Sequence, residues 1–407
     1  MKILLISNGH GEDAIGARLA RELRSLEPMW SLEALPIVGR GDAYGRAGVH
    51  VIGPRWAMPS GGFTFTSLEW FIKDWRAGMY AQTHAQHWAA RNSRPDAVIV
   101  VGDVYALWVT FSFACKDVKP PVYQVQPLVS RYYQDGMTAR TRASRISRVT
   151  VDSFTFPERW YMKRVRQVFA RDERTAAWLH ELGVPQAIFA GNVMMDLLTP
   201  ELELGAVLDG RPVLALLPGT REDYRFSLPV MLEAAGLLPE LQAFAAFPGD
   251  LSNLELPSGW SWVAPTALEA AVSADMVALH TDGARVPVLR SAFAALLHRA
   301  RIALGTAGTG NEQAVGLGVP VVGFVTNGPQ FTASFAHAQQ RLLGAGLRLK
   351  PADPLRLAAA VRNGVSDLAW RAATRAAGLE RMGTFGATRR IVESLLTDLR
   401  SLAQKQR

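Results

Sequence analysis

Short, wholly apolar runs alternate with helical patterns along most of this chain, and this alternation is the feature that most limits its fold. The runs include "KILLIS" (2–7), "AVIVVG" (97–102), "VYQVQ" (122–126), "VLALLP" (213–218), "MVALH" (276–280) and "RIALG" (301–305). Continuous apolar strands separated by amphipathic helices are typical of parallel sheets that are covered on both faces. The sequence therefore predicts an α/β fold with doubly wound sheets.

The length of the chain and one break in its pattern predict two domains. The 407 residues exceed the size at which a single core stops growing. The stretch "TPELELGAVLDGRP" (199–212) is polar and contains Pro and Gly, and a new series of strands begins after it. We expect an N-terminal domain over residues 1–205, a C-terminal domain over residues 206–385 and a C-terminal helix over residues 386–407.

Composition and charge limit the compartment and the partners. The hydrophobic fraction of 49% excludes a disordered or fibrous chain, and the single Cys115 excludes an intramolecular disulfide. No apolar stretch approaches the roughly 20 residues that a spanning helix requires, and we expect no signal peptide before the first strand. We expect a cytoplasmic protein. Its net charge of +8 permits an anionic partner: nucleic acid, lipid headgroups or a phosphorylated small molecule.

Three loops that follow apolar runs carry the chemistry-bearing residues, and the first is "NGHGED" (8–13). Gly9 and Gly11 are followed by Gly16, two positions too late for a dinucleotide fingerprint, so we expect no NAD or FAD cofactor. The loop predicts a turn with His10 at its apex and Asp13 near the N-cap of the next helix. The alternative is that Asp13 only caps the helix and that His10 is solvent-exposed.

The second loop is "LLPGTRED" (216–223), and it has the composition of an anion site. Gly219 and Thr220 offer backbone N–H groups in a tight turn, and the forked guanidinium of Arg221 suits a diphosphate. The alternative is an ordinary turn between a strand and a helix, with a solvated Arg221.

The third loop lies in "ALGTAGTGNEQAVGLGVPVVGF" (303–324). Gly305, Thr306 and Gly308 precede a helix that we expect to begin near Asn311, which would leave N–H groups and a positive helix end for an anion. Glu312 in the first turn suits the hydroxyl pair of a ribose. The alternative is that Glu312 only complements the helix dipole.

Several of these motifs, in order, resemble a known family. The series "SNGHGED", "PD…VGD", "QVQP", "AGNVMMD", "LALLPGTR" and "GTAG…NEQAVGLGVPVVGF" resembles the lipid A disaccharide synthases and the proteins described as related to them. It is similar, more distantly, to the peptidoglycan N-acetylglucosaminyltransferase and the diglyceride glycosyltransferases. The resemblance implies the GT-B fold, in which two Rossmann-like domains face a cleft.

The resemblance also implies an activity: inverting, metal-independent transfer of a sugar from a UDP-sugar to a lipid or lipid-linked acceptor, with N-acetylglucosamine or a related hexose as the sugar. UDP-sugar would be a co-substrate, and no cofactor is implied. Matched to the family's motifs, the donor residues are the turn at Gly219, Thr220 and Arg221, with Thr306, Glu312 and Gln330. Asn192 matches an element at the cleft, and Asp103 matches a catalytic candidate.

The first loop departs from the synthases, whose pattern reads "AGE.SGD". Only Asp13 is in register with it, and His10 is similar to the "GGHG"-like loops of the diglyceride and peptidoglycan enzymes. We interpret His10 or Asp103 as the base that removes the acceptor's hydroxyl proton, with the other orienting it. Asp13 completes the set of catalytic candidates.

Aromatic and basic residues favour contact of the first domain with an anionic membrane surface. The stretch "SLEWFIKDWRAGMY" (67–80) places an apolar stripe on one helical face, with Trp56, Phe63, Phe65 and Trp70 nearby. Residues 131–166 carry nine basic and three acidic side chains. These features predict peripheral association with the inner face of the membrane, whereas the alternative is an ordinary helix that faces the core.

Two other classes of function stay open at this point. One is a nucleotide-sugar epimerase or hydrolase on the same fold, which would consume UDP-sugar without an acceptor. The other is a non-catalytic anion-binding protein. The basic segment contains no recognised nucleic-acid motif, so we expect no nucleic-acid partner.

Overall fold

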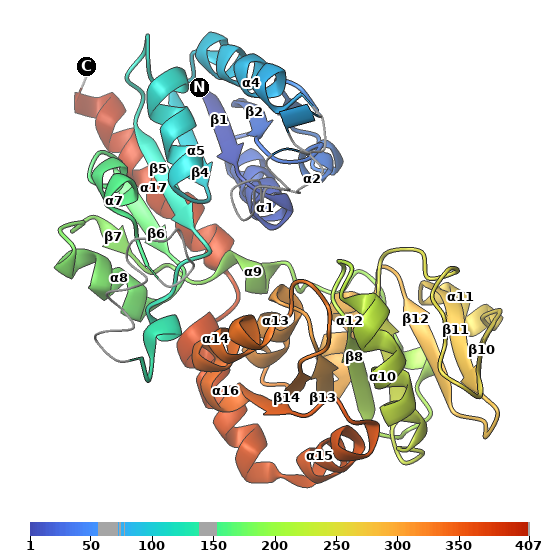
Figure 1. Ribbon diagram of the computed structural model, residues 1–407. Coiled ribbons are helices and arrows are strands. Elements are labelled where there is room, and N and C mark those ends of the chain that lie inside the picture. The colour runs from blue at the N-terminus through green and yellow to red at the C-terminus, as the bar shows by residue number, and fades with distance from the viewer. Residues whose placement is uncertain (56–71, 73–74, 77, 138–152, 406–407) are drawn as a thin grey trace. The chain divides into compact units, whose positions relative to one another are not determined.

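The computed structural model describes residues 1–55, 72, 75–76, 78–137 and 153–405, which form two compact units (Figure 1). Unit 1 comprises Met1–Leu197 together with Phe385–Arg407, and unit 2 comprises Leu198–Thr384. The chain therefore leaves unit 1 between Leu197 and Leu198, directly before the polar stretch at 199–212. Its last helix, α17 (Ala387–Lys405), returns to unit 1.

Unit 1 is built on a parallel sheet with the strand order β3-β2-β1-β4-β5-β6-β7. The strands are β1 (Lys2–Ser7), β2 (Ser31–Pro36), β3 (His50–Val51), β4 (Ala97–Val101), β5 (Val122–Gln126), β6 (Gln167–Ala170) and β7 (Ala187–Ile188). The described α-helices of this unit, besides α17, are α1 (His10–Leu26), α2 (Asp42–Arg46), α4 (Met79–Ser93), α5 (Val104–Val109), α7 (Phe156–Met162), α8 (Glu173–Glu181) and α9 (Val193–Asp196).

Both faces of the unit 1 sheet are buried, which explains why its strands are apolar throughout. Ile3 and Leu5 of β1 point into a core that includes residues of α1 and α17, such as Ile391. Leu4 and Ile6 point into a second core on the opposite face, with residues of α5 and α8. Successive side chains of a strand face opposite sides, so a strand covered on both sides needs an uninterrupted apolar run.

Unit 2 contains a sheet of mixed direction, with the order β10-β11-β12-β9-β8-β13-β14-β15. The strands are β8 (Val213–Leu217), β9 (Gln242–Ala246), β10 (Trp260–Val263), β11 (Ala274–His280), β12 (Arg285–Leu289), β13 (Ala300–Gly305), β14 (Val321–Phe324) and β15 (Leu347–Lys350). The helices are α10 (Tyr224–Gly236), α11 (Ala267–Ala271), α12 (Phe293–Arg299), α13 (Thr309–Gly316), α14 (Ala333–Leu343), α15 (Pro354–Ser366) and α16 (Leu368–Met382).

The expectation of parallel strands throughout is wrong for one part of unit 2. Strand β11 pairs antiparallel with both β10 and β12. The loop between β11 and β12 is too short for the helical crossover that parallel strands require, and it contains Asp282-Gly283, a hairpin signal. The other neighbouring pairs of this sheet are parallel.

Within the described part of the chain, no helix combines the length and the apolar character needed to cross a membrane. The beginning of the predicted apolar stripe, residues 67–71, lies outside the described residues, as do the nearby Trp56, Phe63, Phe65 and Trp70 and the basic residues at 140–148.

Candidate functional site

The chemistry-bearing loops lie at the topological switch point of each sheet. In unit 1 the strand order reverses between β1 and β4, and in unit 2 it reverses between β8 and β13. Ligands of open α/β sheets bind outside the carboxyl ends of the strands at such points, because the loops there diverge to opposite faces. The loops after β1 and β4 carry Asn8 and Asp103, and those after β8 and β13 carry Gly219 and Thr306.

Asp103 is fixed at the switch point of unit 1 by two hydrogen bonds to the same oxygen. Asn8 donates from Nδ2 to Oδ1 of Asp103 at 2.7 Å, and the backbone N–H of Tyr105 donates to Oδ1 at 2.9 Å. Asp103 is the N-cap residue of α5, so its orientation is set by the start of that helix. Burial raises the pKa of the Asp103 carboxyl above its ordinary value, although both hydrogen bonds oppose the rise. A carboxylate with a raised pKa is a better proton acceptor near neutral pH.

A second buried carboxyl belongs to the same electrostatic environment. Gln126, the last residue of β5, donates from Nε2 to Oε1 of Glu158 at 3.0 Å. Burial raises the pKa of Glu158 to about 8, and the charge of Asp103 adds to the rise. A pKa of about 8 favours the neutral form of Glu158 at neutral pH.

The first loop differs from its prediction, because α1 begins at His10. Gly9 is the N-cap residue and His10 is the first helical residue, so His10 does not form the apex of a turn. Its side chain is exposed, and its ring lies over Gly39, where an added Cβ would meet Cε1 of His10 at 2.5 Å. An added Cβ at Gly11 would meet nothing within 4 Å, so no close approach requires glycine there.

Asp13 is buried inside unit 1 and does not cap α1. Its Oδ1 accepts a hydrogen bond of 2.5 Å from the hydroxyl of Ser7, which in turn accepts one of 3.0 Å from Tyr44. Burial raises the pKa of Asp13 to about 7. The residue lies one helical turn after Gly9, so its side chain points back toward the end of β1 and into the sheet rather than toward solvent.

In unit 2 the loops after β8 and β13 are held against each other. Thr306 donates its backbone N–H to the carbonyl of Leu217 at 3.0 Å and its hydroxyl to the carbonyl of Pro218 at 3.3 Å. Gly219 has φ of 81°, a left-handed conformation that favours glycine. Thr220 and Arg221 follow with exposed side chains. The Gly219 turn and the Thr306 loop therefore lie together, as expected of two parts of one anion site.

A buried amide pair fixes the loop before α13. Asn311 donates to Oε1 of Gln339 at 2.9 Å, and Gln339 donates to the carbonyl of Gly308 at 2.7 Å. An added Cβ at Gly305 would meet Oδ1 of Asn311 at 2.1 Å, so this position requires glycine. Helix α13 begins at Thr309, two residues earlier than expected, and this places Asn311 and Glu312 in its buried first turn.

Gln330 is positioned through its backbone. Asp223 accepts hydrogen bonds on Oδ1 from the N–H groups of Gln330 at 3.0 Å and Phe331 at 2.9 Å. Phe331 is buried, whereas the side chain of Gln330 is exposed. Asp223 thus connects the loop after β14 to the start of α10, which follows Arg221.

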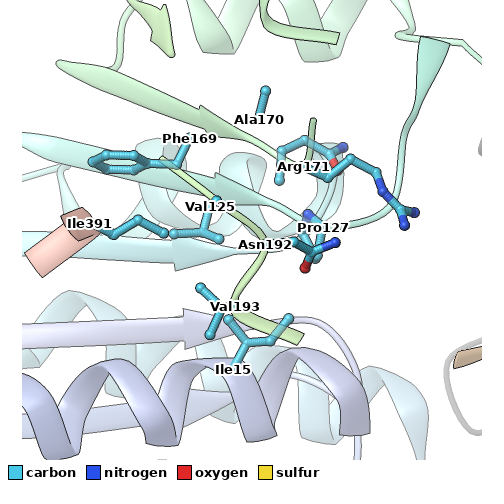
Figure 2. Close-up of a pocket in the computed structure, with 11 residues that line it drawn as sticks. Ile15, Val125, Pro127, Phe169, Ala170, Arg171, Asn192, Val193 and Ile391 are labelled. Atoms are coloured by element: carbon cyan, nitrogen blue, oxygen red, sulfur yellow. The ribbon is translucent and has the colours of Figure 1, made fainter. Parts of the chain in front are cut away.

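Asn192 is the N-cap residue of α9, and its Oδ1 accepts a hydrogen bond from the N–H of Met194 at 3.0 Å. Only 3% of its surface is exposed, and it lines a small pocket in unit 1 with Gln126, Pro127 and Arg171 (Figure 2).

Sequence reasoning did not single out Asn8, Gln126, Glu158 or Arg171. The sequence offers a signal for three of them, because Asn8 and Arg171 directly follow a strand and Gln126 is the last residue of one. Glu158 has no such signal, because it approaches Gln126 only through the packing of α7. Among the described residues, no group of three or more His, Cys, Asp or Glu side chains is arranged to hold a metal ion.

Comparison with known proteins identifies the fold. No family model matches the chain, and no curated protein matches it. Among solved structures, the calicheamicin glycosyltransferase CalG4 has a TM-score of 0.64 at 16% identity, with 99% of both chains covered. A putative UDP-N-acetylglucosamine 2-epimerase from Listeria monocytogenes has a TM-score of 0.59 at 14% identity, with 98% of this chain and 97% of that chain covered.

A third similar structure is the UDP-GlcNAc 2-epimerase from Neisseria meningitidis bound to UDP-GlcNAc, with a TM-score of 0.55 at 15% identity, covering 98% of this chain and all of that chain. These likenesses extend over the whole chain and confirm the predicted fold: two α/β domains of the GT-B architecture. The solved structures that share it include both glycosyltransferases and epimerases.

Proposed function

We propose that this protein is a glycosyltransferase that moves a sugar from a UDP-sugar to a lipid or lipid-linked acceptor with inversion. The observation that carries the proposal is the pairing of the Gly219 turn with the Thr306 loop at the switch point of unit 2. Backbone N–H groups, the N-terminus of α13 and the exposed Arg221 make this edge suitable for a diphosphate. Glycosyltransferases and UDP-GlcNAc epimerases of the same fold support a nucleotide-sugar donor.

In the proposed reaction, the acceptor's hydroxyl oxygen attacks the anomeric carbon of the donor as the bond to the UDP oxygen breaks. The acceptor's proton passes to a base of unit 1, either His10 or Asp103. Asp103 has a raised pKa and an orientation fixed by Asn8, while His10 is exposed. Arg221 and the loop from Gly305 to Gly308 stabilise the negative charge that develops on the leaving UDP.

We further propose that α7 contacts the membrane from which the acceptor is drawn. Phe156 and Trp160 lie one turn apart on this helix and are 73% and 43% exposed. The guanidinium of Arg164 lies 3.4 Å from the centroid of the Trp160 ring, and Lys163 precedes it. Exposed aromatic rings beside cations are suited to an anionic lipid surface. Ile72 and Trp75 of the predicted stripe are also exposed.

The proposal is tested by incubating the purified protein with a panel of UDP- and GDP-sugars, with and without total lipid extract of the host. Transfer predicts a new glycolipid in the mass spectrum and release of UDP that depends on lipid. Epimerisation predicts a changed sugar and hydrolysis predicts released UDP, both without lipid. Binding of UDP without turnover of any donor would indicate a non-catalytic protein and overturn the proposal.

A further inference from the structure

The small pocket of unit 1 combines an apolar interior with two nitrogen donors. Ile15, Val125 and Phe169 form apolar walls, and the polar side chains of the lining are Gln126, Arg171 and Asn192. The amide of Gln126 is hydrogen-bonded to Glu158 and to the backbone N–H groups of Leu128 and Val129, so the donors that concern an incoming group are those of Arg171 and Asn192. Figure 2 shows both polar side chains beyond the carboxyl ends of β5 and β6, away from the ring of Phe169. The interior has space for about one water-sized group, which is the size of a single carboxylate or phosphate oxygen.

The two polar atoms of the Asn192 side-chain amide differ in their hydrogen bonding. Its Oδ1 caps α9 through the N–H of Met194, whereas its Nδ2 is buried and has no hydrogen-bond partner among the described residues. A buried N–H group without a partner costs about 1–3 kcal/mol. An oxygen that entered the pocket would remove this cost, so the orphaned donor itself points to a ligand acceptor.

Arg171 makes the pocket selective for a negative charge. It follows β6 directly, and its side chain is only 4% exposed. One contact is long: Nη1 donates to the carbonyl of Leu128 at 3.4 Å. A guanidinium has five N–H donors, so Arg171 is able to serve an incoming oxygen in addition to its other neighbours.

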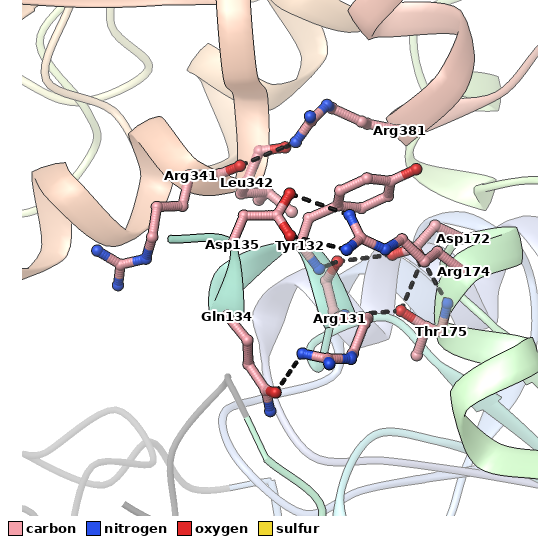
Figure 3. A network of polar contacts seen from close by, with 11 residues as sticks. Arg131, Tyr132, Gln134, Asp135, Asp172, Arg174, Thr175, Arg341, Leu342 and Arg381 are labelled. Carbon is pink, nitrogen blue, oxygen red and sulfur yellow. Dashed lines mark hydrogen bonds and ion pairs between the residues drawn. The ribbon is translucent and has the colours of Figure 1, made fainter. Parts of the chain in front are cut away.

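The loop after β5, which contributes Pro127 to the pocket, continues into a hydrogen-bond network (Figure 3). Asp172, the N-cap residue of α8, accepts hydrogen bonds from Ser130 at 2.7 Å and from the backbone N–H of Thr175 at 2.7 Å. Arg131 donates its backbone N–H to the hydroxyl of Thr175 at 2.9 Å. These bonds fix the loop that follows β5, including Pro127, against α8. The pocket is therefore preorganised, which lowers the entropic cost of binding.

We propose that Arg171 and Asn192 form a binding site for one anionic oxygen, either phosphate or carboxylate, of the acceptor. The assignment to the acceptor rests on the proposed function, because unit 2 carries the proposed donor site. The anion itself comes either from the headgroup of a lipid in a membrane or from a water-soluble acceptor.

Asn192→Asp is the decisive variant. The carboxylate keeps the oxygen that caps α9, and Asp is as good an N-cap residue as Asn, so the fold is preserved. The variant replaces the free N–H donor with an oxygen and places a negative charge beside Arg171. We expect it to weaken anion binding about tenfold or more. Arg174→Gln is the matched control, since it removes an exposed arginine of α8 whose guanidinium pairs with Asp135 at 2.9 Å.

The test measures the thermal stabilisation of the full chain by inorganic phosphate at constant ionic strength, with the UDP site saturated. Phosphate should stabilise the wild type and Arg174→Gln but not Asn192→Asp. Equal stabilisation of all three proteins, or of none while UDP binds, would overturn the inference and leave the proposed function standing. If the protein binds no UDP but phosphate still stabilises the wild type and not Asn192→Asp, the anion site stands and the proposed function is rejected.

Vesicles that contain phosphatidylglycerol distinguish the two sources of the anion. If Asn192→Asp binds these vesicles more weakly than Arg174→Gln does, the site takes a lipid headgroup. If the two variants bind vesicles equally while they differ toward phosphate, the site takes a water-soluble acceptor.

Discussion

Asn8 and Asp103 are 95 residues apart in the sequence, and a hydrogen bond of 2.7 Å from Nδ2 to Oδ1 joins them. The bond connects the loops after β1 and β4 across the point where the strand order of unit 1 reverses. It sets both the orientation of the Asp103 carboxyl and part of its proton affinity.

Removal of this bond should change the pH dependence of the reaction. In Asn8→Ala the Asp103 carboxylate loses a donor that favours its charged form, so the pKa of Asp103 rises further. If Asp103 is the base, the acidic limb of the kcat/KM profile moves to higher pH, while UDP affinity is unchanged. Asp103→Asn should reduce kcat about 100-fold or more. An unaltered acidic limb, with normal turnover in Asp103→Asn, would exclude Asp103 and leave His10→Ala as the variant to examine.

Arg221 should contribute to UDP affinity through its fork of donors. Arg221→Ala is expected to raise the Kd for UDP about tenfold or more, because a charge-assisted hydrogen bond contributes about 1.5–3 kcal/mol. Arg225→Ala is the control, since Arg225 is an exposed arginine four residues further along the chain. Isothermal titration with UDP measures both. Equal Kd values for the two variants would remove Arg221 from the donor site.

Asp13 should make the protein less stable as pH rises from about 4 to about 7. Its pKa is about 7 in the folded state against 3.8 for an ordinary aspartate, so within this window the folded state holds a proton that the unfolded state has released. The free energy of unfolding then falls with pH, by up to about 4 kcal/mol from this group.

Asp13→Asn has no ionisable group at this position and should flatten that dependence. Urea unfolding at pH 4 and pH 8 measures the difference for both proteins. Asp117→Asn, a change at an exposed acid paired with Arg91, is the control and should retain the wild-type trend. Identical pH trends for Asp13→Asn and the wild type would show that Asp13 is charged in the folded state.

Gly16 and Gly11 offer a matched test of packing on α1. An added Cβ at Gly16 would lie 1.9 Å from the hydroxyl oxygen of Tyr44, which is fully buried and bonded to Ser7. Gly16→Ala should therefore destabilise the protein by about 1–3 kcal/mol. Gly11→Ala, where nothing lies within 4 Å, should be neutral or stabilising by up to about 1 kcal/mol. Thermal unfolding of the two variants reports the contrast, and equal melting temperatures would contradict it.

Membrane contact through α7 should depend on its two exposed aromatic rings. The double variant Phe156→Ser and Trp160→Ser is expected to bind anionic vesicles at least about tenfold more weakly, because each ring contributes about 1.5–3 kcal/mol when buried. Leu355→Ser removes a side chain of unit 2 that is 69% exposed, and it serves as the control. Flotation with neutral and anionic vesicles measures the effect. If the double variant floats with anionic vesicles as well as the wild type does, the exposed rings of α7 do not mediate membrane contact.

The sequence by itself determined the elements and the architecture of this protein. Apolar strands buried on both faces leave an uninterrupted signal, and turn residues such as Gly219 mark where they end. The order of the motifs then implied GT-B, which the structural comparisons confirm. The strands β2, β3, β10, β12 and β15 were missed. Most of them are short or only partly buried, and period-based reasoning detects such strands poorly, whereas β12 contains Pro287, which argues against a strand in sequence.

Only the tertiary structure decided which side chains meet. Asp13 and His10 lie three residues apart on one side of α1, yet His10 at the start of the helix is exposed, whereas Asp13, one turn further in, is buried against Ser7. Asp103 is oriented by Asn8, and Glu158 is brought to Gln126 by the packing of α7. The structure likewise placed the orphaned amide of Asn192 in a pocket with Arg171. The local sequence pattern indicates whether a strand or a helix is buried. These contacts, however, join distant segments, and they depend on the order and register of the strands, which cannot be read from a short stretch of sequence.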